Sequence, residues 1–300
     1  MVNEADVRLF ADKCKAIFEQ VGRDIIGQED IVELTVIAMI AGGNVLLEGV
    51  PGIGKTRSLG RVFSLPFSRI QFTPDLMPAD ITGTNVLEKD EKGNAVYTFR
   101  PGPIFSHIVL ADEINRATPK SQSALLEAMQ EHTVTVDGKD YRMEEPFFVL
   151  ATQNPIEQEG TYALPEAQVD RFMFKLLMRY PTVEEMKQIV LMTQKTMDEV
   201  ADGVVDGETL LRMRETAKEI PVTDDIINYT MRLVSSTQPS SPEAGETAAR
   251  MIRLGASPRA AQALITCAKV RAMVSGRFNV SHEDIDALAE ETGELLCSIH

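Results

Sequence analysis

The sequence is poor in cysteine and has no long apolar run, and these absences exclude several classes of protein. Its 300 residues include three cysteines, Cys14, Cys267 and Cys297, at no spacing typical of a metal or redox site. We expect them to be buried thiols in a reducing compartment. The charged N-terminus has no secretory core, and no run reaches the roughly 18 apolar residues of a membrane helix. We therefore expect a cytoplasmic protein with no membrane association.

Basic residues are also scarce. The chain has 30 Lys and Arg against 45 Asp and Glu, which gives a formal net charge of −15. An acidic chain repels a phosphate backbone, so broad nucleic-acid binding is disfavoured, although a local basic patch stays open. The length suffices for one medium domain and a smaller one, with a core in each.

The first 180 residues alternate short apolar runs with helical patterns. Five runs are rich in Val, Ile, Leu and Phe and lack polar alternation, as in parallel strands buried on both faces. They are Val45–Glu48, Arg69–Phe72, His107–Ala111, Phe147–Thr152 and Met173–Met178. The pattern predicts an α/β domain over residues 1–180 with a doubly wound, five-stranded parallel sheet.

Two stretches interrupt this α/β pattern. Residues 74–103 contain turn-forming residues at 90–94, and residues 133–141 alternate around Asp137-Gly138, which is a strong hairpin signal. We expect both stretches to be insertions that project from the sheet.

After Pro181 the strand signals disappear. Four helix starts follow, each with a capping residue: Thr182, Thr223, Ser257 and Ser281. The pattern predicts a small all-α domain over residues 181–300.

Residues Gly49–Thr56, GVPGIGKT, fit the phosphate-binding pattern G-x-x-x-x-G-K-[ST]. Glycines let backbone N–H groups curl around phosphate oxygens, and the following helix points its positive end at them. Lys55 is expected to reach the β- and γ-phosphates, and Thr56 to bind Mg²⁺. We assign ATP binding to Gly49, Pro51, Gly52, Ile53, Gly54, Lys55, Thr56 and Arg57.

The apolar run at 107–111 delivers two carboxylates, Asp112 and Glu113, at the end where α/β sheets place their sites. Asp112 is expected to hold Mg²⁺ through water, and Glu113 to polarise the attacking water. With the phosphate loop, this pair predicts a site that binds Mg-ATP and hydrolyses it.

Three further polar residues have two interpretations each. Asn154 follows an apolar run and either orients the attacking water or forms a turn before Pro155. For Arg171, position alone favours a surface salt bridge over an arginine finger. Arg259 lies in the first turn after Ser257 and either meets a bound anion or stays exposed on its helix.

Taken together, these residues resemble the AAA+ ATPases, and specifically the MoxR family. The nucleotide motifs are common to many AAA+ proteins, whereas residues 72–78 and 164–172 are much more specific. The resemblance covers nearly the whole chain and rests on Gly49–Thr56, Ile70–Pro78, Arg100–Ile104, Asp112–Ala117, Ala151–Pro155, Leu164–Phe172 and Gly255–Ala260.

The resemblance implies roles for residues that position alone leaves open. Asn154 matches the sensor-1 asparagine, and Arg171 matches an arginine finger that acts on a neighbouring subunit's ATP. Arg259 matches the sensor-2 arginine, which reaches from the lid to complete the site. Residues 25–28, which include Ile25 and Ile26, match the segment that contacts adenine before the phosphate loop. The family implies a P-loop AAA+ core with an α-helical lid, assembled as a hexameric ring with ATP sites between subunits.

The same resemblance implies a chaperone-like ATPase that matures or remodels partner complexes, often with von Willebrand A-type partners. The two insertions correspond to the helix-2 insert of this clade and to the hairpin before sensor 1. One departure lies in Arg57–Pro66, where ten residues stand in place of roughly thirteen, so the helix after the phosphate loop is expected to be nearly a turn shorter.

Two other functions compete with remodelling by an ATP-driven ring. A nucleic-acid motor of a related AAA+ clade would need basic insertions, but the tips at 90–92 and 137–140 carry mixed charge. A small-molecule kinase could use the same phosphate loop, but the AAA+-like segments after Asp112 argue against it.

Overall fold

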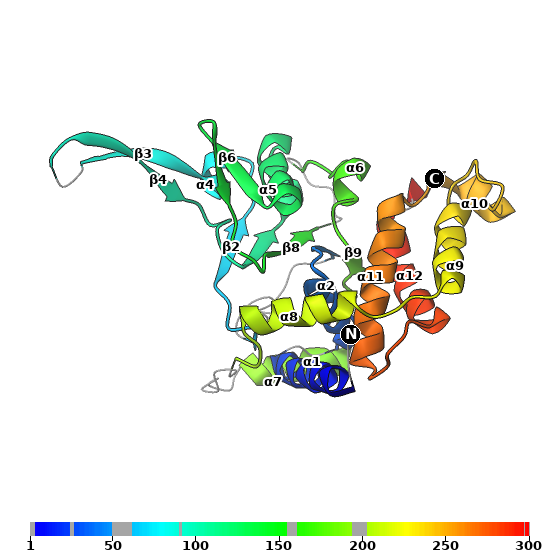
Figure 1. The fold of residues 1–300 in the computed structure, drawn as a ribbon. Coiled ribbons are helices and arrows are strands. Elements are labelled where there is room, and N and C mark those ends of the chain that lie inside the picture. Colours follow the sequence, from blue (N-terminus) through cyan, green and yellow to red (C-terminus); the bar gives the residue numbers. More distant parts are fainter. Residues whose placement is uncertain are drawn as a thin grey trace.

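The computed structural model describes residues 4–24, 27–49, 62–89, 92–154, 161–193, 203–296 and 298–299 (Figure 1). Its centre is a parallel five-stranded sheet with the strand order β2-β5-β8-β1-β9. The strands are β1 (Val45–Glu48), β2 (Phe67–Gln71), β5 (Ile108–Asp112), β8 (Phe148–Gln153) and β9 (Phe174–Leu177). All five predicted strands are therefore confirmed, with ends that match or are shifted by one or two residues.

Successive side chains of a strand point to opposite faces of the sheet, and both faces here are apolar. Helices therefore cover both faces. Val45 and Leu47 of β1 join one apolar core, and Leu46 joins the other. The elements at the first core include α1 (Glu4–Asp24) and α2 (Glu29–Ala41), and those at the second include α4 (Pro78–Thr82), the 3₁₀ turn Ile114–Arg116 and α5 (Pro119–Glu131). The short helix α6 (Glu166–Val169) precedes β9.

Both predicted insertions contain hairpins. The first carries β3 (Gly83–Lys89) and β4 (Ala95–Pro101), which project from the body of the molecule (Figure 1). The second consists of β6 (Thr133–Val136) and β7 (Lys139–Arg142). The bases of the two hairpins touch, because the ring of Phe99 stacks on Tyr141 with 3.8 Å between centroids. The two hairpins therefore pack against each other through these two rings.

The C-terminal region is mainly helical, as predicted. Its helices are α7 (Val183–Thr193), α8 (Gly207–Lys218), α9 (Asp224–Ser236), α10 (Glu246–Met251), α11 (Pro258–Val274) and α12 (His282–Leu296). The expectation of no strand after Pro181 is wrong at one place, where β10 (Ile252–Leu254) pairs with β11 (Ser298–Ile299). Runs of two or three residues are too short for a periodicity signal. None of the described helices is long and apolar enough to cross a membrane.

The apolar core does not stop at residue 180. Leu210 of α8 and Leu264 of α11 share one buried cluster with Ile37 of α2. Arg214 of α8 adds polar contacts, since its side chain donates to the carbonyls of Met39 and Ile40 at 3.3 Å. The helix α2 has no basic residue in its own last turn, so this arginine satisfies its carbonyl end. The expected separate core for the C-terminal region is thus replaced by a shared one, and the boundary at 180 stays a prediction.

Candidate nucleotide site

The chain leaves β1 at Gly49, the first residue of the predicted phosphate loop. Gly49 has φ +149°, and its N–H donates to the carbonyl of Gln153 at 3.1 Å. A Cβ atom there would lie 2.8 Å from Cβ of Met178, so the close approach of β9 requires glycine. The other predicted ATP contacts lie outside the described residues: Ile25, Ile26, Pro51, Gly52, Ile53, Gly54, Lys55, Thr56 and Arg57. The shortened helix expected at 57–66 also begins outside them.

Asp112 ends β5 and is anchored by both neighbouring strands. Its Oδ1 accepts a hydrogen bond from the hydroxyl of Thr152 on β8 at 2.7 Å. Its Oδ2 pairs with the guanidinium of Arg69 on β2, with Nε at 3.2 Å. The side chain is only 13% exposed. A carboxylate held on both oxygens keeps a fixed orientation at the carboxyl ends of the strands.

Glu113 follows in a left-handed backbone conformation with φ +56°. This conformation is uncommon for a residue with a side chain, and such backbone strain clusters at functional sites. Its Oε2 accepts hydrogen bonds from Nε2 of Gln71 at 3.0 Å and from Nη1 of Arg116 at 2.9 Å. Its backbone N–H donates to the Thr152 hydroxyl at 2.9 Å. One hydroxyl therefore ties the two consecutive acids to β8.

Asn154 lies at the same edge, immediately after β8. The carbonyl of Asn154 accepts a hydrogen bond from Nδ2 of Asn115 at 2.9 Å. Because β8 lies between β5 and β1, this asparagine stands between the two acids and the start of the phosphate loop. The structure thus brings together Gly49, Asp112, Glu113 and Asn154, as the sequence predicts.

The segment before the phosphate loop also reaches this edge. The guanidinium of Arg179 donates to the carbonyl of Gly27 at 3.0 Å, and Nε2 of Gln28 donates to the carbonyl of Arg179 at 3.1 Å. Arg179 follows Met178, which packs against Gly49. The described end of the expected adenine segment is therefore held beside the first residue of the loop.

The two predicted arginines lie elsewhere, at the amino ends of the strands. Met173 N–H donates to the carbonyl of Asn44 at 2.7 Å, which places the segment before β9 at the start of β1. In this segment, Nη1 of Arg171 donates to the carbonyl of Leu126 on α5 at 2.8 Å. Arg259 of α11 pairs with Asp170, with Nη1 and Oδ2 3.1 Å apart.

Arg259 lies away from the start of the phosphate loop of its own subunit, and the expectation that it completes an ATP site stays a prediction. Arg259 is separated from Gly49 by the length of β1, about 13 Å for four residues at ~3.3 Å each. The physical reason is the packing of α11 on α2, which aims the start of α11 at the amino ends. Asp170 then fixes the arginine there.

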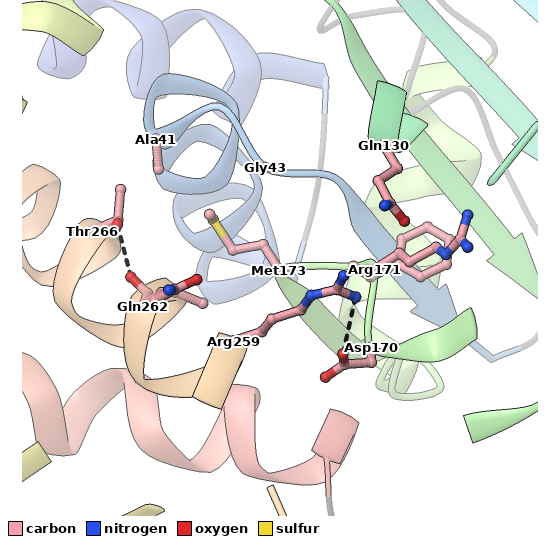
Figure 2. Close-up of a pocket in the computed structure, with 11 residues that line it drawn as sticks. Ala41, Gly43, Gln130, Asp170, Arg171, Met173, Arg259, Gln262 and Thr266 are labelled. Carbon is pink, nitrogen blue, oxygen red and sulfur yellow. Dashed lines mark hydrogen bonds and ion pairs between the residues drawn. The ribbon is translucent and has the colours of Figure 1, made fainter. Parts of the chain in front are cut away.

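Both arginines line a pocket of about 320 Å³ (Figure 2). Its walls come from the end of α2, from α5, from the segment before β9 and from α11, and they include Ala41, Gly43, Gln130, Met173, Gln262 and Thr266. Its charged lining consists of these two guanidinium groups and the carboxylate of Asp170, which pairs with Arg259.

Four side chains that hold the two acids were not singled out from the sequence. Arg69 and Gln71 alternate along β2, so both point to one face, and this spacing could have marked them. Thr152 stands two residues before Asn154, and Arg116 stands three residues after Glu113. Their roles depend on the register between β2, β5 and β8, which no local pattern gives.

Comparison with known proteins identifies the family. Residues 44–174 match the family described as "ATPase family associated with various cellular activities (AAA)", and residues 245–292 match the AAA lid domain. The chain is 43% identical over 278 residues to the uncharacterised protein YeaC of Bacillus subtilis, which covers 91% of this chain and 83% of that protein.

A relative with a named function matches equally well. The chaperone MoxR1 of Mycobacterium tuberculosis is 43% identical over 274 residues, 90% of this chain and 71% of its own length. A crystal structure from Cytophaga hutchinsonii, described provisionally as an ATPase, superposes with a TM-score of 0.90 at 38% identity. That match covers 98% of this chain and 89% of the other. The chain therefore belongs to the MoxR family of AAA+ ATPases, and it is an ATP hydrolase.

Proposed function

We propose that this ATPase works as a ring, hexameric by family resemblance, in which each Mg-ATP is bound by one subunit and completed by the next. The observation that carries the proposal is the placement of acids and arginines at opposite ends of one sheet. In a head-to-tail ring, the amino-end face of one subunit meets the carboxyl-end face of its neighbour. Arg171 and Arg259 then approach the nucleotide bound beside Asp112 and Glu113 of the adjacent copy.

At the carboxyl ends, Lys55 and the backbone of the phosphate loop bind the phosphates. Asp112 and Thr56 would hold Mg²⁺, which supplies positive charge against the β- and γ-phosphate oxygens when bound. An anchored carboxylate fits this cation, which keeps several waters and takes few protein ligands. No group of three or more His, Cys, Asp or Glu side chains within the described ranges forms a metal cage.

Glu113 is the proposed base. Its carboxylate accepts a hydrogen bond from the attacking water, and Asn154 orients that water. The water oxygen bonds to the γ-phosphorus, the bond from that phosphorus to the bridging oxygen breaks, and ADP leaves with the bond's electron pair. The water proton passes to Glu113 or to the phosphate product. The hydrogen bonds from Gln71 and Arg116 hold the Glu113 carboxylate in place before the water binds.

The arginines of the neighbouring subunit stabilise the charge that spreads over the transferred phosphoryl group. In related phosphoryl-transfer enzymes, an arginine finger raises kcat by a factor of about 10³–10⁵. Arg171 has this role in our proposal, and Arg259 adds a second cation from the lid. The energy of the cycle remodels a client protein or a von Willebrand A-type partner.

The proposed compartment is the cytoplasm, and the cysteines support it. Cys14 and Cys267 are free, buried thiols. Burial raises the pKa of Cys14 to about 12, so its thiol stays protonated and unreactive at neutral pH. Free thiols of this kind suit a reducing environment.

The test of the shared site is complementation between two inactive variants. Lys55→Ala loses nucleotide binding but keeps both arginines, and Arg171→Ala keeps the phosphate loop but lacks the finger. Mixed rings are expected to regain part of the ATPase rate, because some junctions pair an intact loop with an intact finger. Arg232→Ala, an exposed arginine of α9, is the matched control and should keep full activity. No recovery in rings shown to be mixed would contradict the proposal.

The client can be sought with the same protein. Glu113→Gln should bind ATP without hydrolysing it and so hold the client-bound state. Affinity capture with this variant in ATP, compared with capture in ADP, identifies partners that depend on the ATP state.

A further inference from the structure

Two acidic side chains of the segment before β9 bind the lid. Glu166 and Asp170 are four residues apart on α6 and its C-terminal cap, so both lie on one side of the helix. Glu166 pairs with Arg253 of β10, and Asp170 pairs with Arg259 of α11. The lid is thus joined to this segment by two ion pairs of the same kind.

Asp170 contacts two residues at the start of α11. Its Oδ2 accepts from Nη1 of Arg259 at 3.1 Å, as Figure 2 shows, and its Oδ1 accepts from the hydroxyl of Ser257 at 2.6 Å. The Ser257 oxygen in turn caps α11 by accepting from the N–H of Arg259 at 3.1 Å. Asp170 therefore fixes both the cap and the first turn of the lid helix.

The next residue in the chain is the proposed finger. Arg171 extends to α5, where its guanidinium donates to the carbonyl of Leu126. Asp170 thus binds Arg259 of the lid, and the next residue, Arg171, binds α5 of the α/β domain. Asp170 therefore links the start of α11 to the backbone next to Arg171.

We infer that Asp170 is a positioning residue that holds Arg259 beside Arg171, so that both cations reach the neighbouring subunit's phosphates as one preset group. The inference rests on the proposed shared site. The Asp170 carboxylate pairs with the guanidinium of Arg259 and fixes the orientation of its planar fork. Arg259 is 52% exposed and gives one nitrogen to Asp170, so its other N–H groups remain for a phosphate while the ion pair stays closed.

The alternative is that Asp170 only attaches the lid. Glu166 provides the matched control, because it lies on the same helix and its ion pair with the lid is formed with Arg253 and not with a pocket arginine. Attachment alone predicts similar effects for Asp170→Asn and Glu166→Gln. Positioning predicts a rate effect confined to Asp170.

The test is ATPase kinetics with the full chain. Asp170→Asn should lower kcat about tenfold or more, the loss expected for a charge-assisted hydrogen bond, and should leave ATP binding by the subunit unchanged. Glu166→Gln should change kcat by less than about twofold. In the Arg259→Ala background, Asp170→Asn should add little further loss, because the group it positions is already absent. Asp170→Glu should restore part of the rate.

Complementation separates this inference from the proposed function. Asp170→Asn mixed with Lys55→Ala should recover activity as the Arg171→Ala mixture does. Recovery with Arg171→Ala but not with Asp170→Asn would overturn the inference alone, and failure of both mixtures would remove the shared site and the inference together. An unchanged kcat for Asp170→Asn, an equal loss for Glu166→Gln, or full additivity with Arg259→Ala would also overturn it. If Asp170→Asn does not fold, Asp170→Ser is measured in its place, and an unchanged kcat there would overturn the inference.

Discussion

The two ends of the central sheet carry different functional side chains, and these are held in different ways. At the carboxyl ends, Asp112 and Glu113 are fixed by side chains from the adjacent strands β2 and β8. At the amino ends, Arg171 and Arg259 are fixed by a carbonyl of α5 and by Asp170. In our proposal each end holds some of the groups that ATP hydrolysis needs. The difference between the two ends is the basis for proposing that a single chain presents two halves of a site on separate faces.

The ends also differ in their dependence on the lid. The acids sit in a continuous sheet, so their geometry does not need the helices after residue 203. The arginine end is tied to α11, which packs on α2 through the shared core. Changes in the lid should therefore disturb catalysis through the arginines and leave the binding of ATP to the loop intact.

The largest effect on the ATPase rate is expected when the proposed arginine finger, Arg171, is removed. Arg171→Ala should lower kcat by about 10³-fold or more, since it removes the main charge that stabilises the transferred phosphoryl group. ATP affinity of the isolated subunit should stay unchanged, because Arg171 lies away from its own loop. Steady-state ATPase assays with equilibrium binding of a fluorescent ATP analogue measure both quantities. A loss of affinity equal to the loss of rate would assign Arg171 to its own subunit's site.

The corresponding change at the carboxyl ends is Glu113→Gln. It should lower kcat by about 10²–10⁴-fold, because the amide cannot accept the proton of the attacking water. Binding of ATP should persist. Glu208→Gln, an exposed glutamate of α8, is the control and should keep the wild-type rate. A wild-type rate in Glu113→Gln would exclude this carboxylate as the base.

A third change tests the lid by itself. The side chain of Asp284 is fully buried and pairs with Arg271 and Arg277. Burial opposes its ionisation, but hydrogen bonds from Arg277, Ser281 and Arg271 outweigh burial and lower the pKa below 3.8. Asp284→Asn leaves two arginines without their partner and should cost about 3 kcal/mol of stability, read from urea unfolding. Glu243→Gln, exposed in the lid, should cost almost nothing.

The sign of the pH dependence follows from the direction of that shift. Because the pKa of Asp284 is lower in the folded state, the unfolded chain takes up the proton more readily. Its contribution is complete above the unfolded value near 3.8 and is lost as the pH falls through the lower folded value. Wild-type stability should therefore fall in this acidic range more steeply than that of Asp284→Asn, and parallel curves would contradict the assignment.

The smallest expected effect belongs to Asn154. Asn154→Ala should lower kcat by about tenfold to a hundredfold, which corresponds to one hydrogen bond to a charged or reacting group. Asn228→Ala, exposed on α9, is the matched control. Stopped-flow measurement of phosphate release determines whether the loss lies in the chemical step. A wild-type rate in Asn154→Ala would show that Asn154 does not orient the attacking water and only forms the turn before Pro155.

The parts of the fold that follow from local patterns could be predicted from the sequence. The five strands, the hairpin at Asp137-Gly138 and the acids at the end of β5 each depend on a short stretch of chain. The position of Arg259 could not be predicted, because it depends on how α11 packs on α2, more than 200 residues away in the sequence. The partners of Glu113 likewise depend on strand register, and the β10–β11 pair joins two runs too short to show periodicity.

The most direct test of the account is the structure of the ATP-bound Glu113→Gln assembly by electron cryomicroscopy. We predict a ring in which Arg171 and Arg259 of one subunit lie within hydrogen-bond distance of the γ-phosphate on the next. In that ring, Asp170 still contacts Arg259. An ATP whose phosphates meet Arg259 of the same chain, or an assembly in which the two faces do not meet, would contradict it.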